Sequence, residues 1–186
     1  MALAAAEAGI KAIIIPADNA AEASIAAAGI KVFPAAYLPQ VVEFLLGIAE
    51  IAPLEPYCLD DLRQSRQCEV DFSDVRGQAH VKRALEIAAC GGHNIMMKGP
   101  PGSGKTMLAR RLATILPAMS FDEIIETTKI YSISGQHHGV QIFRPFRAPH
   151  HTISDAGLIG GGNTPRPGEV SMAHNGVLFL DELPEF

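Results

Sequence analysis

The sequence predicts an α/β fold in two parts, with parallel strands. Short apolar runs alternate with helical segments from residue 10 to residue 46. Strand and helix alternating with short loops imply a parallel, right-handed crossover unit. Further along, the apolar run Asn94–Lys98, a glycine-rich loop and a helical segment follow one another, and a second apolar run occupies Val177–Leu180. These patterns predict a second α/β sheet.

Composition limits the class of protein. Hydrophobic residues make up 48% and charged residues 19% of the 186 positions, which excludes a disordered tail, a collagen-like fibre and a disulfide-built miniprotein. The formal net charge of −5 gives no strongly basic footprint for nucleic acid. Cys58, Cys68 and Cys90 are an odd, widely spaced set that suits a reducing compartment. No apolar run spans a bilayer and no signal peptide is evident, so we expect a cytoplasmic protein without a membrane partner.

The first part covers residues 1–51. The run Ile10–Ile15, stopped by Pro16, has the apolar character of a parallel strand buried on both faces. Asn19 and Glu22 have the spacing of a capping box and open the next helix. Two strands and two helices bury too little surface to be stable alone, so this part is a piece of a domain. The remaining expected elements are the end of a helix at Leu3–Ala8, the helix through Ala28, a strand at Ile30–Phe33 and a helix at Leu38–Leu46.

Residues 52–70 change character. Pro53 and Pro56 are followed by a polar stretch with no sustained period. Such a composition is typical of a linker, so the second part begins at Asp71.

The second part covers residues 71–186. Ser73 or Asp74 is expected to cap its first helix, which Gly91–Gly92 ends. The run Asn94–Lys98 predicts a strand, a helix follows over about 105–116, and residues 121–160 hold short strands and loops that the pattern does not place. The apolar stripe of the first helix comprises Val81, Leu85, Ala88 and Ala89, and the core of the predicted strand comprises Met96 and Met97.

The loop from Gly99 to Thr106 matches the phosphate-loop pattern at every fixed position. Glycines let backbone N–H groups converge on a phosphate, and the following helix points its positive end at the same anion. We expect Lys105 to reach the β- and γ-phosphates and the Thr106 hydroxyl to bind Mg²⁺. A glycine-rich turn carrying Lys and Thr by chance is disfavoured, because a strand precedes the loop and a helix follows. The expected nucleotide contacts are Gly99, Pro100, Pro101, Gly102, Ser103, Gly104, Lys105, Thr106 and Met107.

Two carboxylates follow the apolar strand Val177–Leu180. The strand places them at the edge of the sheet where the phosphate loop also opens. Asp181 would hold Mg²⁺, directly or through water, and Glu182 would orient and deprotonate the attacking water. An apolar strand that simply meets solvent is the alternative, but its pairing with the phosphate loop favours catalysis. We therefore expect ATP and Mg²⁺, with Lys105 and Glu182 as catalytic residues.

Weaker signals surround this pair of motifs. Arg144 and Arg147 would contact nucleic-acid phosphates or acidic residues of a neighbouring subunit, unless they lie on a solvated loop. The adjacent pairs His137–His138 and His150–His151 do not converge easily on one metal ion. Cys90-Gly91-Gly92-His93 has the spacing of half a zinc site without a second half, so no zinc is expected.

Longer stretches of the chain resemble a known family. Val75-Arg76-Gly77-Gln78, the phosphate loop and the strand with its two carboxylates resemble an AAA+ ATPase. Additional stretches resemble the magnesium-chelatase-like branch, and specifically the ComM (YifB-type) competence-protein family. These stretches are Arg144–His151, Gly160–Gly162, Pro167–Glu169 and Ala173–Glu182. Residues 1–47 are similar to the tail of the Lon-protease-like domain that precedes the ATPase in this family.

The resemblance implies a domain plan. Residues 1–51 would be the C-terminal part of a Lon-protease-like (S5 domain 2-like) domain and 52–70 a linker. Residues 71–186 would be the N-terminal part of an AAA+ magnesium-chelatase-like ATPase domain, truncated after the Walker B strand. The chain would lack the Ser–Lys dyad, sensor residues, arginine finger and lid, so we expect no peptidase activity and an ATPase that is inactive as this fragment alone.

The resemblance also implies an incomplete P-loop (AAA+) α/β sheet, because the two strands that flank the phosphate-loop strand in that fold come last in sequence. The Met96 strand would then lack hydrogen-bond partners and be separated from the Val177 strand. We therefore expect residues 71–186 to be unstable or partly disordered unless another chain or a rearrangement completes the sheet.

For the whole protein, the resemblance implies a hexameric ring ATPase that acts on DNA, with branch migration during natural transformation as the family role. Arg144–His151 would approach DNA or a neighbouring subunit. Two alternatives stay open: a nucleotide-gated module that remodels a protein or inserts a metal, and a fragment that serves only as a folding or contact surface.

Overall fold

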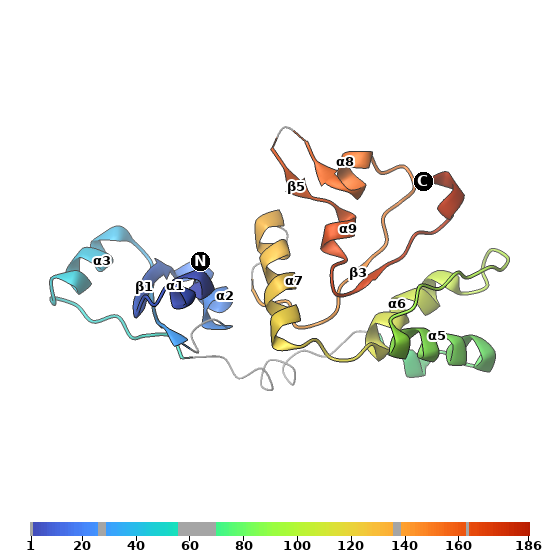
Figure 1. Cartoon of the computed structure of the whole chain (residues 1–186), viewed down its shortest axis with the longest axis horizontal. Helices are drawn as coiled ribbons and strands as arrows, with labels where there is room; N and C mark the ends of the chain where they lie inside the picture. Colours follow the sequence, from blue (N-terminus) through green and yellow to red (C-terminus); the bar gives the residue numbers. More distant parts are fainter. Residues whose placement is uncertain (1, 26–28, 56–69, 136–138, 163) are drawn as a thin grey trace. The chain divides into compact units, whose positions relative to one another are not determined.

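The computed structural model describes residues 2–25, 29–55, 70–135, 139–162 and 164–186. They divide into two compact units, the first drawn from 1–66 with 135–140 and the second from 67–134 with 141–186. Both units are α/β, as the sequence predicts (Figure 1). Most of the expected linker, residues 56–69, lies outside the described residues. No helix among the described residues has both the length and the apolar character that a membrane span requires.

The first unit is built on two parallel strands. Strand β1 (Ala12–Pro16) pairs with β2 (Lys31–Ala35), with Ile13 opposite Val32. The connection between them contains α2, so the predicted parallel crossover is confirmed. Val32 is fully buried in a small core with Ala2, Ala23 and Ile30. Among the described residues of this unit, the helical segments are α1 (Ala2–Glu7), the 3₁₀ turn η1 (Ala17–Asn19), α2 (Ala20–Ser24) and α3 (Leu38–Leu45).

Two details of the first unit differ from the sequence-based expectations. The strand β1 is half-buried rather than buried on both faces: Ala12 and Pro16 are exposed, and the three isoleucines between them are only partly buried. Asn19 makes no side-chain capping hydrogen bond, because it closes the 3₁₀ turn η1 instead of standing in the extended conformation of an N-cap. Residues 26–28 of the predicted helix lie outside the described residues.

The second unit has its core between two helices. In α5 (Ala79–Gly91), Leu85 and Ala89 pack with Leu108 and Leu112 of α6 (Lys105–Ile115). Phe72 and Val75 complete this cluster and Val177 packs against it. The predicted stripe of the first helix is thus confirmed except for Val81, which is 36% exposed. The other helical segments are η3 (Phe72–Asp74), α7 (Phe121–Ser134), α8 (Asp155–Leu158), α9 (Glu169–Met172) and η4 (Leu183–Glu185).

The helix cap predicted at Ser73 or Asp74 is wrong. Asp71 accepts a hydrogen bond from the Ser73 N–H, and Asp74 accepts one from the Asp71 N–H, so the capping box belongs to η3. The hydrogen bonds that it accepts from Ser73 hold the pKa of the Asp71 carboxyl below its usual value. Helix α5 begins at Ala79, and its N-cap is Gln78, whose backbone is left-handed. The sequence also failed to place α7, which occupies 121–134.

Short strand pairs stand where the second sheet was expected. Strand β3 (Phe146–Arg147) pairs in parallel with β6 (Val177–Leu178), so the second apolar strand lies where predicted but spans only two residues. A separate antiparallel pair joins β4 (Gly160–Gly161) and β5 (Arg166–Pro167).

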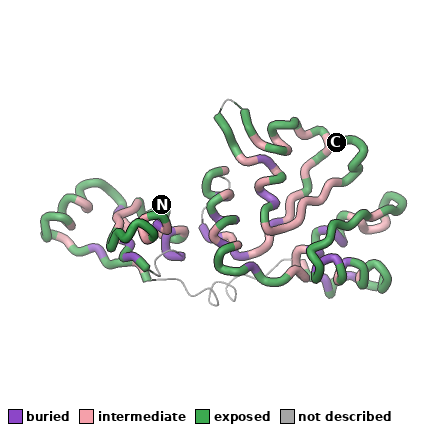
Figure 2. Tube along the Cα trace, viewed as in Figure 1, coloured by how far each residue is buried: buried purple, intermediate pink, exposed green. Residues whose placement is uncertain are grey.

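The strand predicted at Asn94–Lys98 is absent. No described strand pairs with this segment, and Met96 is 82% exposed instead of lying in the core. Figure 2 shows the loop between α5 and α6 as almost wholly exposed. A strand needs a neighbour to bond its N–H and C=O groups, so an apolar run without that neighbour stays irregular. Met97 is half-buried against the helical core.

Candidate functional site

The glycine-rich loop leads directly into α6. Gly102 (φ +77°) and Gly104 (φ +85°) are left-handed, a conformation that glycine adopts without a Cβ clash. Gly104 is the N-cap of α6 and its carbonyl accepts the Leu108 N–H at 2.9 Å. Within the described residues, the N–H groups of Gly102, Gly104, Lys105 and Thr106 donate no hydrogen bond. The end of the loop and the start of the helix thus offer several free donors to one anion.

The Lys105 side chain folds over this loop. Its Nζ donates to the carbonyl oxygens of Gly99 at 3.0 Å and Pro100 at 3.1 Å. An ammonium group has three donors, so it remains able to bind an anion while it holds the start of the loop. Further along α6, Met107 is 37% exposed, with its terminal methyl beside Gly104.

The two sequence motifs meet at a hydrogen bond. Thr106 Oγ1 donates to Asp181 Oδ2 at 3.1 Å, across 75 positions of sequence. Thr106 lies in the first turn of α6, and Asp181 follows β6, whose Val177 packs on the core that α6 helps to form. The packing of β6 against the α5–α6 core therefore positions both side chains.

Glu182 has a partner that the sequence analysis did not assign. Its carboxylate Oε2 lies 3.3 Å from Nδ1 of His151, and Glu182 is left-handed at φ +56°. The ring of His150 lies against that of His151 at a centroid distance of 4.1 Å. The double histidine was visible in the sequence, but its nearness to Glu182 depends on the β3–β6 pairing, which brings residues 146–151 beside 177–182.

The donor set fits a nucleotide with Mg²⁺. The Thr106 hydroxyl and the Asp181 carboxylate are oxygen ligands that suit Mg²⁺, which usually binds one or two protein oxygens, phosphate oxygens and water. Among the described residues, no group of three or more His, Cys, Asp and Glu side chains is arranged to hold a metal ion.

Arg144 is paired within the second unit. Its Nε donates to the Pro117 carbonyl at 2.6 Å, and its Nη1 donates to the Asn175 carbonyl at 2.7 Å. Both of its terminal nitrogens donate to the carboxylate of Glu123 at 3.1 Å. The pKa of Glu123 lies below its usual value, chiefly because of the Ser120 backbone N–H and also because of Arg144.

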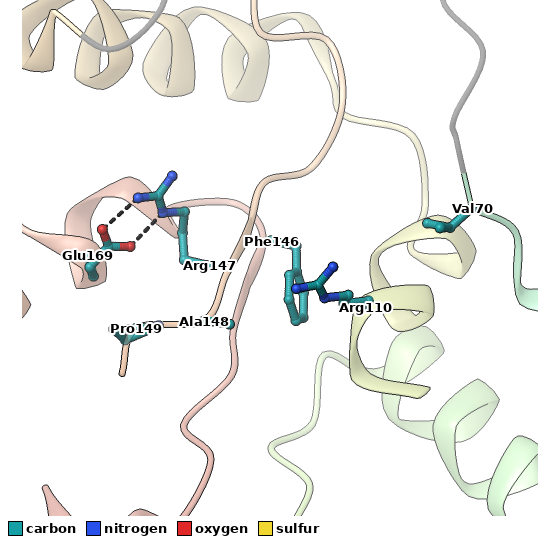
Figure 3. Close-up of a pocket in the computed structure, with 7 residues that line it drawn as sticks. All are labelled: Val70, Arg110, Phe146, Arg147, Ala148, Pro149 and Glu169. Carbon is teal, nitrogen blue, oxygen red and sulfur yellow. Dashed lines mark hydrogen bonds and ion pairs between the residues drawn. The ribbon is translucent and has the colours of Figure 1, made fainter. Parts of the chain in front are cut away.

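Arg147 is also paired. It forms a two-point ion pair with Glu169 at the start of α9, drawn in Figure 3. The hydrogen bonds that Arg147 donates to Glu169 raise the pKa of its guanidinium further above its usual value. Both residues line an open cavity of about 500 Å³. The charge of Arg147 in the wall of this cavity is therefore neutralised by Glu169. The remaining lining residues are Val70, Arg110, Phe146, Ala148 and Pro149.

Other residues singled out in the sequence lie elsewhere. Cys90 is exposed near the end of α5, and His93 follows that helix. Cys58, Cys68 and the pair His137–His138 lie outside the described residues.

A glycine-rich loop at the start of a helix, with a first-turn hydroxyl bonded to a carboxylate that follows a parallel strand, is the arrangement typical of P-loop proteins. Residues 71–186 match the family described as magnesium chelatase, subunit ChlI. The chain therefore belongs to that family, which is one of AAA+-type ATPases.

Individual relatives agree with this family. The chain is 47% identical to Competence protein ComM of Haemophilus influenzae over 191 residues, covering 100% of this chain and 37% of the relative. It is 47% identical to YifB of Salmonella typhimurium over 178 residues, covering 94% of this chain and 34% of the relative. An archaeal Lon protease of Archaeoglobus fulgidus is 39% identical over 54 residues, which cover 29% of this chain. The chain thus spans only about a third of the length of the two first relatives.

Proposed function

We propose that this chain carries the ATP site of a ring ATPase that acts on DNA. The observation that supports it best is the hydrogen bond of 3.1 Å between Thr106 Oγ1 and Asp181 Oδ2. These two groups are the hydroxyl and the carboxylate that the proposed Mg²⁺·ATP site requires. A chance glycine-rich turn gives no reason for a carboxylate from a distant strand to lie there.

Each side chain of the site has a distinct role in this proposal. The free N–H groups of the loop and the Lys105 ammonium bind the phosphates. Thr106 and Asp181 hold the metal ion, which neutralises charge on the phosphate oxygens when bound. Glu182 accepts a proton from the attacking water, and His151 at 3.3 Å orients that carboxylate.

The action on DNA is proposed for the whole protein. The relative from Haemophilus influenzae bears the name competence protein, and the resemblance of the motifs implies branch migration during natural transformation by a hexamer in the cytoplasm. We assign residues 1–51 to a Lon-protease-like domain, 52–70 to a linker and 71–186 to the ATPase domain. A DNA or subunit contact by Arg144 and Arg147 would require both to exchange their present partners, Glu123 and Glu169. Unchanged DNA-stimulated ATPase after charge reversal at both arginines would exclude that contact.

A second function is favoured by the description of the family itself, which names a chelatase subunit. In that case the same ATP site would drive a protein-remodelling or metal-inserting assembly. The whole protein separates the two: stimulation of its ATPase by DNA supports the motor, and stimulation by a protein or porphyrin partner supports the alternative.

The ATP site itself is tested by limited proteolysis with mass mapping, with and without Mg²⁺·ATP. We expect nucleotide to protect residues 71–186 in the wild type and in Lys98→Ala, a control lysine that is exposed just before the loop. We expect no protection in Lys105→Ala. Equal digestion of wild type and Lys105→Ala in the presence of nucleotide would show that this chain has no working ATP site.

A further inference from the structure

Gln78 holds an unusual backbone conformation next to the phosphate loop. It is one of three described non-glycine residues with a positive φ, here +51°, and its carbonyl starts α5 by accepting the Lys82 N–H at 3.0 Å. Residues other than glycine reach this region at a cost, and such outliers concentrate at functional sites. An N-cap residue normally caps its own helix with its side chain, and that of Gln78 does not.

The side chain of Gln78 reaches the phosphate loop instead. Its Nε2 donates to the Ser103 carbonyl at 3.4 Å, across 25 positions of sequence. A Cβ placed on Gly104 would lie 3.9 Å from the same nitrogen, so the amide rests against the Ser103–Gly104 peptide.

The hydrogen bond to the Ser103 carbonyl also fixes the direction in which the Gly104 N–H points. In a planar trans peptide the C=O and the N–H point to opposite sides. With the Ser103 carbonyl held toward Gln78, the Gly104 N–H points away from Gln78, and it has no partner among the described residues. Gly104 has no Cβ to resist rotation of this peptide, and a rotated peptide would turn the Ser103 carbonyl toward a bound anion and repel it.

We propose that Gln78 is a positioning residue of the phosphate loop, whose amide keeps the Gly104 N–H available to a phosphate oxygen. The inference rests on the proposed function, because it requires the loop to bind a nucleoside triphosphate. It extends that function by placing a determinant of phosphate affinity outside the loop, in the turn before α5.

Three substitutions separate the amide from the backbone that carries it. Gln78→Glu keeps the shape but places an acceptor against the carbonyl. Gln78→Asn tolerates the left-handed backbone but is one methylene too short to reach. Gln78→Gly removes the side chain and relieves the backbone strain together.

The experiment measures the Kd of Mg²⁺·ATP and of Mg²⁺·tripolyphosphate by calorimetry, and the urea unfolding midpoint, for the 186-residue chain. We expect both Kd values to rise about three- to tenfold in Gln78→Asn and Gln78→Gly, the range of one neutral hydrogen bond, and further in Gln78→Glu. We expect the unfolding midpoint to be unchanged in Gln78→Asn and unchanged or raised in Gln78→Gly.

Three outcomes would overturn the inference. Unchanged affinity for both probes in all three variants would show that the amide does not position the loop. Weakened ATP binding with unchanged tripolyphosphate binding would place the contact at another part of the nucleotide. Affinity that falls only together with the unfolding midpoint would reduce Gln78 to a stability role.

The control Lys105→Ala identifies which proposal has failed. If the wild type binds neither probe, or binds them no better than Lys105→Ala, the proposed function is refuted and this inference with it. If Lys105→Ala weakens binding and the Gln78 variants do not, only the role of Gln78 is refuted.

Discussion

Replacing Arg144 with alanine should destabilise the second unit strongly, although the sequence predicts for this arginine a contact with DNA or a neighbouring subunit. Its side chain is only 15% exposed, and it joins three separate segments through Pro117, Glu123 and Asn175. Truncation removes all of these contacts together. The carbonyls of Pro117 and Asn175 and the carboxylate of Glu123 then lose the guanidinium that donates hydrogen bonds to them.

The magnitude follows from the kinds of contact that are lost. Hydrogen bonds from a charged donor contribute about 1.5 kcal/mol each at the low end of their range, and two go to the carbonyls of Pro117 and Asn175. The ion pair with Glu123 adds about 0.5 kcal/mol, because the Glu123 side chain is 31% exposed and solvent weakens the attraction. We therefore expect Arg144→Ala to lower the free energy of unfolding by about 3–4 kcal/mol.

The assay is urea unfolding followed by circular dichroism, which suits a chain without tryptophan. The matched control is Arg83→Ala, because Arg83 is 73% exposed and, among the described residues, pairs only with Glu86 within α5. We expect this control to change stability by less than about 0.5 kcal/mol, and Arg144→Lys to fall between the two variants. If Arg144→Ala lowers the free energy of unfolding by less than about 1 kcal/mol, the structural role of Arg144 is refuted. A DNA contact would then again be a candidate role for this residue.

Three further predictions follow from the second unit. Leu85 is fully buried between α5 and α6, so Leu85→Ala should cost about 3 kcal/mol in the same urea assay; a cost near zero would contradict the packing described. The pKa of Glu123 is lowered in the folded chain, so its contribution to stability is complete above its usual value of 4.5 and disappears as the pH falls through the lower folded value. Unfolding midpoints measured against pH should show this loss in the wild type, and an equally steep loss in Glu123→Gln would assign it to other groups. Gly104→Ala places a Cβ on a backbone at φ +85°, so it should weaken Mg²⁺·ATP binding at least tenfold in calorimetry, and unchanged binding would mean that the loop tolerates another conformation.

Local chemistry made much of the second unit predictable. Gly102 and Gly104 take up the left-handed conformations that a phosphate loop demands, and α6 begins at Lys105 as expected. The apolar spacing of Leu85, Ala88 and Ala89 predicted the buried face of α5. These features depend on residues within one or two turns of each other.

The sequence-based predictions that differ from the structure share a different cause. The apolar run Asn94–Lys98 has the composition of a strand, but a strand exists only where another strand bonds its backbone, and the described residues supply none. Arg144 is exposed or paired depending on whether Glu123 and Asn175 lie beside it, which its neighbours in sequence do not specify.

The sequence by itself determined the α/β class, the phosphate loop with its helix, and the identity of the two carboxylates after the second apolar strand. It did so because backbone preferences and apolar periodicity act over a few residues. The tertiary structure alone decided that Thr106 bonds Asp181, that His151 lies beside Glu182 and that Gln78 reaches Ser103. Each of these contacts joins residues that are 25 or more positions apart, and such a distance is closed only when α5, α6 and β6 pack on one core.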